Sequence, residues 1–359
     1  MTGSFYWHGC NYPWSFDGQT AYYGLDFGAN VWGSHLGVAT RRTRVAEDFA
    51  RMASLGFTAV RWFLFCDGRS GIVYDDRGYP EGLDARLFGD LDAALEIASA
   101  AGVGVSFVML DHRWCFAGLA GAEVDPVTGE TLQVTLPEGR ASVLLHHEGR
   151  DALFERVLGP VVERYGRGGA RADLSGSVLA YELMNEPDFV IEEWEADVSR
   201  QVPRPLPFAV LADAVERFSD LVHSRSDART TLGGARLRNL WAWEDAALGL
   251  DVLQVHSYPD VRDSSRDVDV YGTPAETLVG ARPLLLGEFP GNGPERHPAR
   301  CAPPATTLDQ YLEFAVRAGY VGAWPWSFSG TDDYGPLPHE PLRLFARAHP
   351  ELVNPRCTL

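Results

Sequence analysis

Two glutamates, Glu186 and Glu288, stand where a carboxylate is costly unless it serves chemistry. Each closes a short, mainly apolar run that is typical of a fully buried strand in a parallel sheet. A carboxylate at the carboxyl end of such a strand loses hydration, which proteins tolerate mainly at reactive sites. Two carboxylates on one rim could serve as proton donor and nucleophile, the pairing that cleaves glycosidic bonds with retention of configuration.

The elements that would position these residues alternate along the whole chain. Short apolar segments alternate with amphipathic ones, which predicts repeated βα units and a parallel sheet. Eight strands are expected, near residues 5–11, 59–65, 103–110, 178–184, 231–234, 252–256, 283–288 and 321–326. Helices are expected over residues 43–55, 83–101, 151–165 and 307–318, each ended by a glycine: Gly56, Gly102, Gly166 and Gly319. We therefore predict an α/β fold, a single (β/α)8 TIM barrel, with residues 1–359 forming one catalytic domain.

Two connections are too long for plain loops between a strand and a helix. One follows the third strand, from about residue 113 to residue 147, and residues 125–130 within it are expected to form the turn of a hairpin. The other follows the fourth strand, from about residue 187 to residue 207. Because both leave the carboxyl ends of strands, we expect both to lie over the reactive face and to shape a cleft there.

Further polar and aromatic side chains come at the ends of other predicted strands. Taken singly, an Arg there is more often an ion-pair partner, and a His more often a satisfied, partly buried side chain. Trp324 is expected to belong to the wall or core, whereas several other tryptophans, Trp14 and Trp32 among them, could line the cleft or simply pack. The argument depends on the whole set appearing in order: Arg61, His112, Asn185, Glu186, His256, Tyr258, Glu288 and Trp326.

This ordered set resembles glycoside hydrolase family 5, the cellulase and mannanase family of clan A. That family has an Arg after its second strand and a His after its third. An Asn-Glu pair follows the fourth strand, a His-x-Tyr the sixth, a Glu the seventh and a Trp the eighth. The resemblance extends from Arg61 to Trp326, almost the whole chain.

The resemblance implies a role for each residue. Glu186 would be the general acid and then the general base, and Glu288 the nucleophile. The remaining residues would support them: Arg61 and Tyr258 would hold Glu288 ionised, His256 would lie near Glu186, Asn185 would contact the sugar 2-hydroxyl, His112 would bind another hydroxyl, and Trp326 would form an apolar platform under the sugar.

Composition narrows the partners. The net charge is −18 and the chain has no Lys, which argues against nucleic acid and fits a neutral carbohydrate. No stretch approaches ~20 apolar residues, so no membrane partner is expected. The five cysteines show no Cys-x-x-Cys, and His8, Cys10, His112 and Cys115 lack metal-site spacing, so neither a metal nor a cofactor is expected.

The amino-terminal segment shows no signal peptide, which favours a cytoplasmic location unless the natural chain begins earlier. The expected activity is that of a retaining β-glycoside hydrolase on β-linked mannosidic or glucosidic oligosaccharides or small glycosides. Two alternatives stay open: an intracellular transglycosidase or biosynthetic enzyme that uses the same site, and a non-catalytic sugar-binding barrel. The sequence leaves open the sugar, the linkage, endo or exo action and the oligomeric state.

Overall fold

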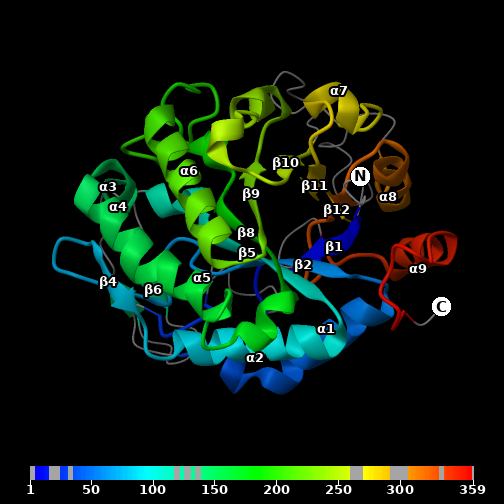
Figure 1. Ribbon diagram of the computed structural model, residues 1–359, viewed down its shortest axis with the longest axis horizontal. Helices are drawn as coiled ribbons and strands as arrows, with labels where there is room; N and C mark the ends of the chain where they lie inside the picture. The colour runs from blue at the N-terminus through cyan, green and yellow to red at the C-terminus, as the bar shows by residue number, and fades with distance from the viewer. Residues whose placement is uncertain are drawn as a thin grey trace.

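Eight parallel strands close into a barrel in the computed structural model (Figure 1), which describes residues 5–15, 25–30, 35–116, 122–124, 131–133, 139–258, 270–291, 306–330 and 335–357. Each strand pairs with its neighbours in chain order, and β1 closes the ring against the last strand. The predicted (β/α)8 barrel is therefore confirmed. Its strands are β1 (Trp7–Asn11), β2 (Ala59–Phe63), β5 (Gly104–Asp111), β8 (Val178–Asn185), β9 (Arg229–Gly234), β10 (Leu253–His256), β11 (Leu284–Glu288) and β12 (Gly322–Ala323).

Each of the eight predicted strand segments overlaps one of these strands, although β5, β8 and β9 extend one or two residues beyond the predicted bounds. The largest difference is at β12, whose regular part covers only two of the six expected residues. Trp326 instead forms an isolated bridge with Pro290, beyond the ends of β11 and β12. The single-domain assignment of residues 1–359 stays a prediction.

Helices surround the barrel on the outside (Figure 1). They are α1 (Arg42–Ser54), α2 (Leu87–Ala101), α3 (Ala141–Leu145), α4 (His147–Leu153), α5 (Gly159–Tyr165), α6 (Phe208–Arg225), α7 (Ala275–Val279), α8 (Leu308–Arg317) and α9 (His339–Ala348). The sequence-based interpretation did not include α3, α6, α7 or α9. No helix in the part of the chain described above has both the length and the apolar character needed to cross a bilayer.

Three details of the predicted helices were wrong. Residues 83–86 precede α2 because Leu83 ends β4 (Pro80–Leu83), which pairs antiparallel with β3 (Ile72–Tyr74). Residues 151–165 do not form one regular helix, since a π-helical turn, η3 (Phe154–Leu158), separates α4 from α5. Gly166 has extended backbone angles, whereas Gly102 takes the left-handed conformation expected of a helix cap.

The two long connections follow β5 and β8. In the first, β6 (Ala122–Val124) and β7 (Thr131–Gln133) pair antiparallel, which confirms a hairpin; its turn, residues 125–130, lies outside the described residues. The second begins with η5 (Pro187–Phe189) and returns along a bridge between Ile191 and Leu206. Both connections leave the carboxyl ends of barrel strands, as the sequence predicted.

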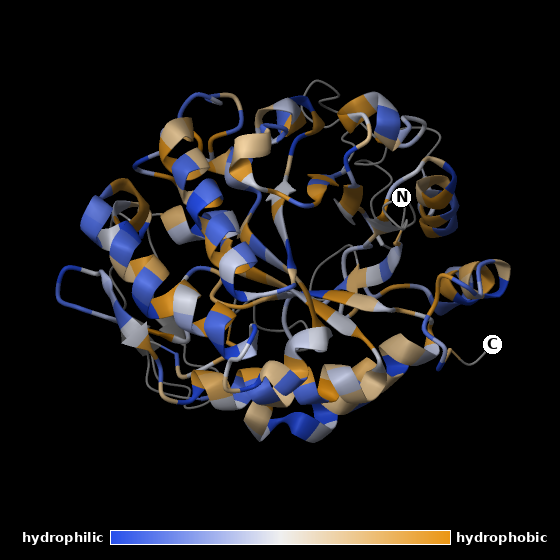
Figure 2. Cartoon of the chain, in the orientation of Figure 1, coloured by the Kyte–Doolittle hydropathy of each residue, from blue (hydrophilic) through white to orange (hydrophobic). Residues whose placement is uncertain are grey.

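The barrel strands are rich in hydrophobic residues (Figure 2), and buried apolar side chains from strands and helices pack together in a core cluster. In α8, for example, Leu308, Tyr311, Leu312 and Ala315 are buried, a spacing that places them on one face. Burying such a face stabilises the fold by about 25 cal/mol per Å² of apolar surface. This packing fixes the strands, and hence the polar side chains at their carboxyl ends.

Candidate active site

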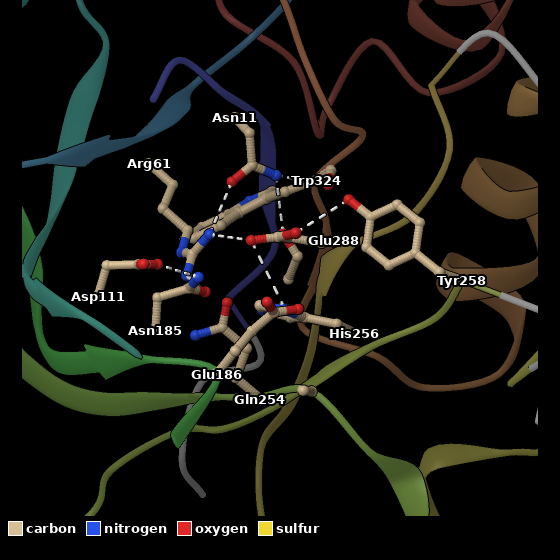
Figure 3. Close-up of polar contacts among 12 residues, drawn as sticks. Asn11, Arg61, Asp111, Asn185, Glu186, Gln254, His256, Tyr258, Glu288 and Trp324 are labelled. Atoms are coloured by element: carbon tan, nitrogen blue, oxygen red, sulfur yellow. Dashed lines mark hydrogen bonds and ion pairs between the residues drawn. The ribbon is translucent and has the colours of Figure 1, made fainter. Parts of the chain in front are cut away.

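Glu288 ends β11 and is held at both of its carboxylate oxygens (Figure 3). Arg61, in β2, donates from Nη1 to Oε1 at 2.5 Å, and the hydroxyl of Tyr258 donates to Oε2 at 2.9 Å. The residue is buried, with 4% of its surface exposed. These contacts fix the orientation of the carboxylate, and both favour its ionised form.

Glu186 follows β8 in a tight turn and points toward Glu288 (Figure 3). Its Oε1 lies 3.0 Å from Nδ1 of His256, and the same nitrogen lies 3.6 Å from Oε1 of Glu288. One ligand atom from each of these three residues lies within 4.8 Å of the others. The two carboxyl groups are therefore close together, as in retaining glycosidases, where the separation is about 5–5.5 Å.

Burial acts to raise the pKa of both carboxyl groups, and His256 acts to lower it. Burial raises the pKa of Glu288, and the charge of Glu186 adds to that rise, although His256, Arg61 and Tyr258 oppose it. Burial also acts to raise the pKa of Glu186, but its hydrogen bond to His256 and its interactions with His256 and His112 outweigh burial and lower that pKa below its usual value. Two carboxyl groups this close resist double ionisation, so they titrate as a coupled pair that readily holds one shared proton.

Arg61 lies at the centre of a buried polar layer beneath the two glutamates. Its guanidinium donates to both oxygens of Glu182, at 2.8 and 2.6 Å, and to Oδ1 of Asn11 at 3.0 Å. Glu182 also accepts a hydrogen bond from Gln254 at 2.9 Å. The buried positive charge of Arg61 is thus shared between Glu182 and Glu288, and these contacts hold the guanidinium group in one position.

Sequence reasoning missed three members of this layer, Asn11, Glu182 and Gln254. The sequence does carry a signal for Glu182, because it is a charged residue inside a segment whose other residues predict a buried strand. No comparable signal marks Gln254, whose role depends on the barrel bringing β10 beside β9 and β11.

Asn185 links Arg61 to the end of β5. Its carbonyl oxygen accepts from Arg61 Nη2 at 2.7 Å, and its amide donates to Asp111 at 2.7 Å. Burial acts to raise the pKa of Asp111, but His112, Arg113 and this amide outweigh it and hold the pKa well below its usual range. Asp111 in turn raises the pKa of His112 against the opposing effect of burial.

His112 lies at the edge of the pair. Its Nδ1 is 3.8 Å from Oε2 of Glu186, and its ring packs between Phe116 and Phe189, at centroid distances of 5.2 and 4.9 Å. The eight predicted site residues therefore divide into seven polar side chains around one centre and a single indole, Trp326. Their catalytic roles stay predictions.

Trp326 belongs to an apolar cluster with Trp14, Phe63 and Cys66, against which Tyr258 packs. Its ring meets those of Trp14 and Phe63 edge-on, at centroid distances of 6.1 Å each. Because Tyr258 also contacts Glu288, the cluster borders the carboxylate pair. Trp324 is fully buried, as expected for core, and Trp32 lies outside the described residues.

The same three side chains could also be considered as a metal-binding site. Glu186, His256 and Glu288 are the group of three potential metal ligands found among the described residues. However, the guanidinium of Arg61, 2.5 Å from Glu288, already supplies a fixed positive charge there. A second cation beside Arg61 would be repelled, so the arrangement fits acid–base and nucleophilic chemistry better.

Several known structures have the same fold. A β-mannanase from the blue mussel Mytilus edulis superposes with a TM-score of 0.68 at 17% identity, over 95% of this chain and 90% of that one. A β-1,4-mannanase from the sea hare Aplysia kurodai gives 0.69 at 15% identity, over 96% and 93%. An exo-β-1,4-mannosidase from Opitutaceae bacterium strain TAV5 gives 0.58 at 16% identity, over 98% and 62%. No family model matches the sequence, and no curated protein matches it. At these identities the likeness establishes the (β/α)8 fold.

Proposed function

We propose that the protein is a retaining β-glycoside hydrolase in which Glu186 is the acid/base and Glu288 the nucleophile. The observation that carries the proposal is a pair of carboxyl groups with one oxygen of each within 4.8 Å of the other. Glu288 is held by Arg61 and Tyr258, and Glu186 lies beside His256. This asymmetry gives the two groups different tasks, because only one of them is bound by donors at both oxygens.

In the first step, Glu288 would attack the anomeric carbon while Glu186 protonates the departing oxygen. Arg61 and Tyr258 favour the ionised form of Glu288 and aim it at the sugar. We assign the shared proton to Glu186 for this step, against the directions in the free site, where the pKa of Glu288 is raised and that of Glu186 is lowered. The protonated carboxyl of Glu186 can then donate a hydrogen bond to Nδ1 of a neutral His256, 3.0 Å away, which holds the acid in place.

In the second step, water would release the sugar from Glu288. Once Glu288 is an ester it has lost its charge, so Glu186 is more easily ionised and can take a proton from the attacking water. Asn185, fixed between Arg61 and Asp111, is placed to contact the sugar 2-hydroxyl near the reacting carbon. Such a contact strengthens as the transition state gains oxocarbenium character.

A β-mannoside is the favoured substrate class. Each of the similar structures named above is described as a mannanase or a mannosidase. The barrel supplies an indole and a phenol, Trp326 and Tyr258, beside the nucleophile, which suits the apolar face of a sugar ring. The proposed reaction uses no metal or cofactor.

The test is turnover of a panel of nitrophenyl β-glycosides (manno, gluco, galacto, xylo and fuco) and of matching short oligosaccharides. The wild type should cleave the β-mannoside, and Glu288→Gln, which keeps the shape of the side chain, should lose at least ~10³-fold in kcat. Circular dichroism and the melting temperature would verify that this variant is folded. Equal rates for the two proteins would refute the assignment of the nucleophile, and no turnover of any β-glycoside would refute the function.

A further inference from the structure

The turn that carries Glu186 is fixed by a residue outside the set described above. Glu186 has a φ of 48°, a left-handed conformation that residues with a side chain seldom adopt. Its N–H donates to the carbonyl of Gly233 at 2.7 Å. Two residues later, fully buried Asp188 accepts from the backbone N–H of Ala235 at 2.9 Å and from the amide of Asn239 at 2.7 Å. The turn after β8 is therefore bound at several points to the segment after β9.

The same contacts continue into the long connection after β8. Asn239 also donates to Asp197 at 3.1 Å, and Asp197 pairs with both Arg236 and Arg238. Arg236 lies over the ring of Phe189, the neighbour of Asp188, with its guanidinium carbon 5.1 Å from the ring centroid. Asp197 is paired with two guanidiniums, whereas the Ala235 N–H and the Asn239 amide that donate to Asp188 are both neutral.

That environment makes Asp188 an unusual choice for a purely structural position. Burial raises its pKa to about 6, and the charge of Glu186 adds to the rise. A buried carboxylate without a cation costs stability, and a neutral side chain of similar size would avoid that cost. What the carboxylate provides is two strong acceptors, one for each donor, directly behind the turn.

We infer that Asp188 is a positioning residue for the acid/base: it fixes the left-handed turn of Glu186, and so keeps the carboxyl group beside His256 and within reach of the leaving-group oxygen. This inference rests on the proposed function. The inference follows from the chain geometry. Asp188 is separated from Glu186 by Pro187 alone, and it is hydrogen-bonded to the segment after β9 rather than to β8, the strand that it follows. Displacing a proton donor by ~1 Å can cost about 10²-fold in rate.

The experiment compares the wild type, Asp188→Ala and Asp188→Asn on two aryl glycosides of the sugar that the wild type accepts. A dinitrophenyl leaving group departs without protonation, whereas a phenyl leaving group requires it. Asp188→Ala should lose ~10-fold or more in kcat/KM on the phenyl glycoside and less than about 3-fold on the dinitrophenyl glycoside. Asp188→Asn, which keeps the shape and one acceptor, should recover part of the loss and covers the case in which the alanine variant does not fold.

The matched control is Asp92→Asn, in which a partly buried Asp that accepts from Arg164 and Tyr165 in the helical shell is changed. It should alter stability but affect both substrates by the same factor. Equal losses on the two substrates for the Asp188 variants would overturn the inference while leaving the hydrolase function intact.

Crystal structures of the wild type and Asp188→Asn separate this inference from the function itself. The inference expects Glu186 to leave its positive φ, or to lose its 3.0 Å approach to His256, in the variant. An unchanged turn would overturn the inference, whatever the activity. A wild type that cleaves no glycoside would refute the proposed function, and the position of Glu186 in the two crystal structures would still decide whether Asp188 fixes the turn.

Discussion

At the scale of single residues, the site is organised by one guanidinium that serves two carboxylates. Arg61 is completely buried and gives a bidentate contact to Glu182 and a single contact to Glu288. Glu182 therefore limits how much positive charge Glu288 experiences. This division matters because the proposed nucleophile must be ionised to react, yet must remain a good enough leaving group in the second step.

Glu182→Gln tests that division through the pH dependence of activity. Removing the charge of Glu182 leaves Arg61 to pair with Glu288 alone, so the pKa of Glu288 should fall. Because activity requires ionised Glu288, the acidic limb of the kcat/KM profile should move to lower pH. The change should also cost about 3–5 kcal/mol of unfolding free energy, as breaking a buried ion pair does. The measurement is kcat/KM of the variant and the wild type between pH 4 and pH 8. An acidic limb that stays at the same pH or moves to higher pH would contradict the prediction.

At the scale of elements, the sequence located the strand ends but not what lies inside the strands. Glu186 and Glu288 could be predicted because each interrupts an apolar run at its carboxyl end, and Arg61 because the ordered motifs supported it. Gln254 and Asn11 could not, because their function depends on neighbours that only the closed barrel brings together. Asp188 could not be predicted either, since its partners after β9 are about 50 residues away in the sequence.

Strand β9 shows how tightly the elements surround the polar layer. A methyl group on Gly233 would lie 2.4 Å from Oε1 of Glu182 and 3.0 Å from Nη2 of Arg61, distances that force the side chains apart. Gly89, in α2, is exposed, and a methyl group there would meet nothing within 4 Å. The same substitution should therefore have opposite effects at the two positions.

Gly233→Ala should lower the unfolding free energy by about 1–3 kcal/mol, as overpacking does, and should reduce kcat/KM at least ~10-fold by displacing Arg61. Gly89→Ala should raise stability by roughly 0.5–1 kcal/mol, because alanine is the better helix former, and should leave activity unchanged. Urea unfolding and steady-state kinetics on the two variants provide the comparison. A fully active Gly233→Ala would show that the layer beneath the glutamates tolerates rearrangement.

At the scale of the whole molecule, the end of the barrel away from the proposed site has stabilising polar contacts of its own. The proposed site lies at the carboxyl ends of the strands, whereas the carboxyl-terminal segment of the chain closes the other end. There, buried Asn354 donates through its amide to the carbonyls of Phe57, Ala101 and Gly102, at 2.9–3.2 Å. These residues immediately precede β2 and β5, so one side chain ties the end of the chain to two βα units.

Asn354→Ala should therefore destabilise the protein without changing its chemistry. The variant leaves three buried or partly buried carbonyls without this donor, a loss of about 1–3 kcal/mol in unfolding free energy. Well below the melting temperature, kcat/KM should equal that of the wild type, because the strand ends that hold Glu186 and Glu288 are at the opposite face.

Asn354→Asp is the matched control: it keeps the shape of the side chain but removes both N–H donors, so it should lower the unfolding free energy by at least as much. If the aspartate variant were as stable as the wild type, the stabilisation would come from packing rather than from hydrogen bonds. If either folded variant lost activity, the two ends of the barrel would be coupled, which this arrangement does not predict.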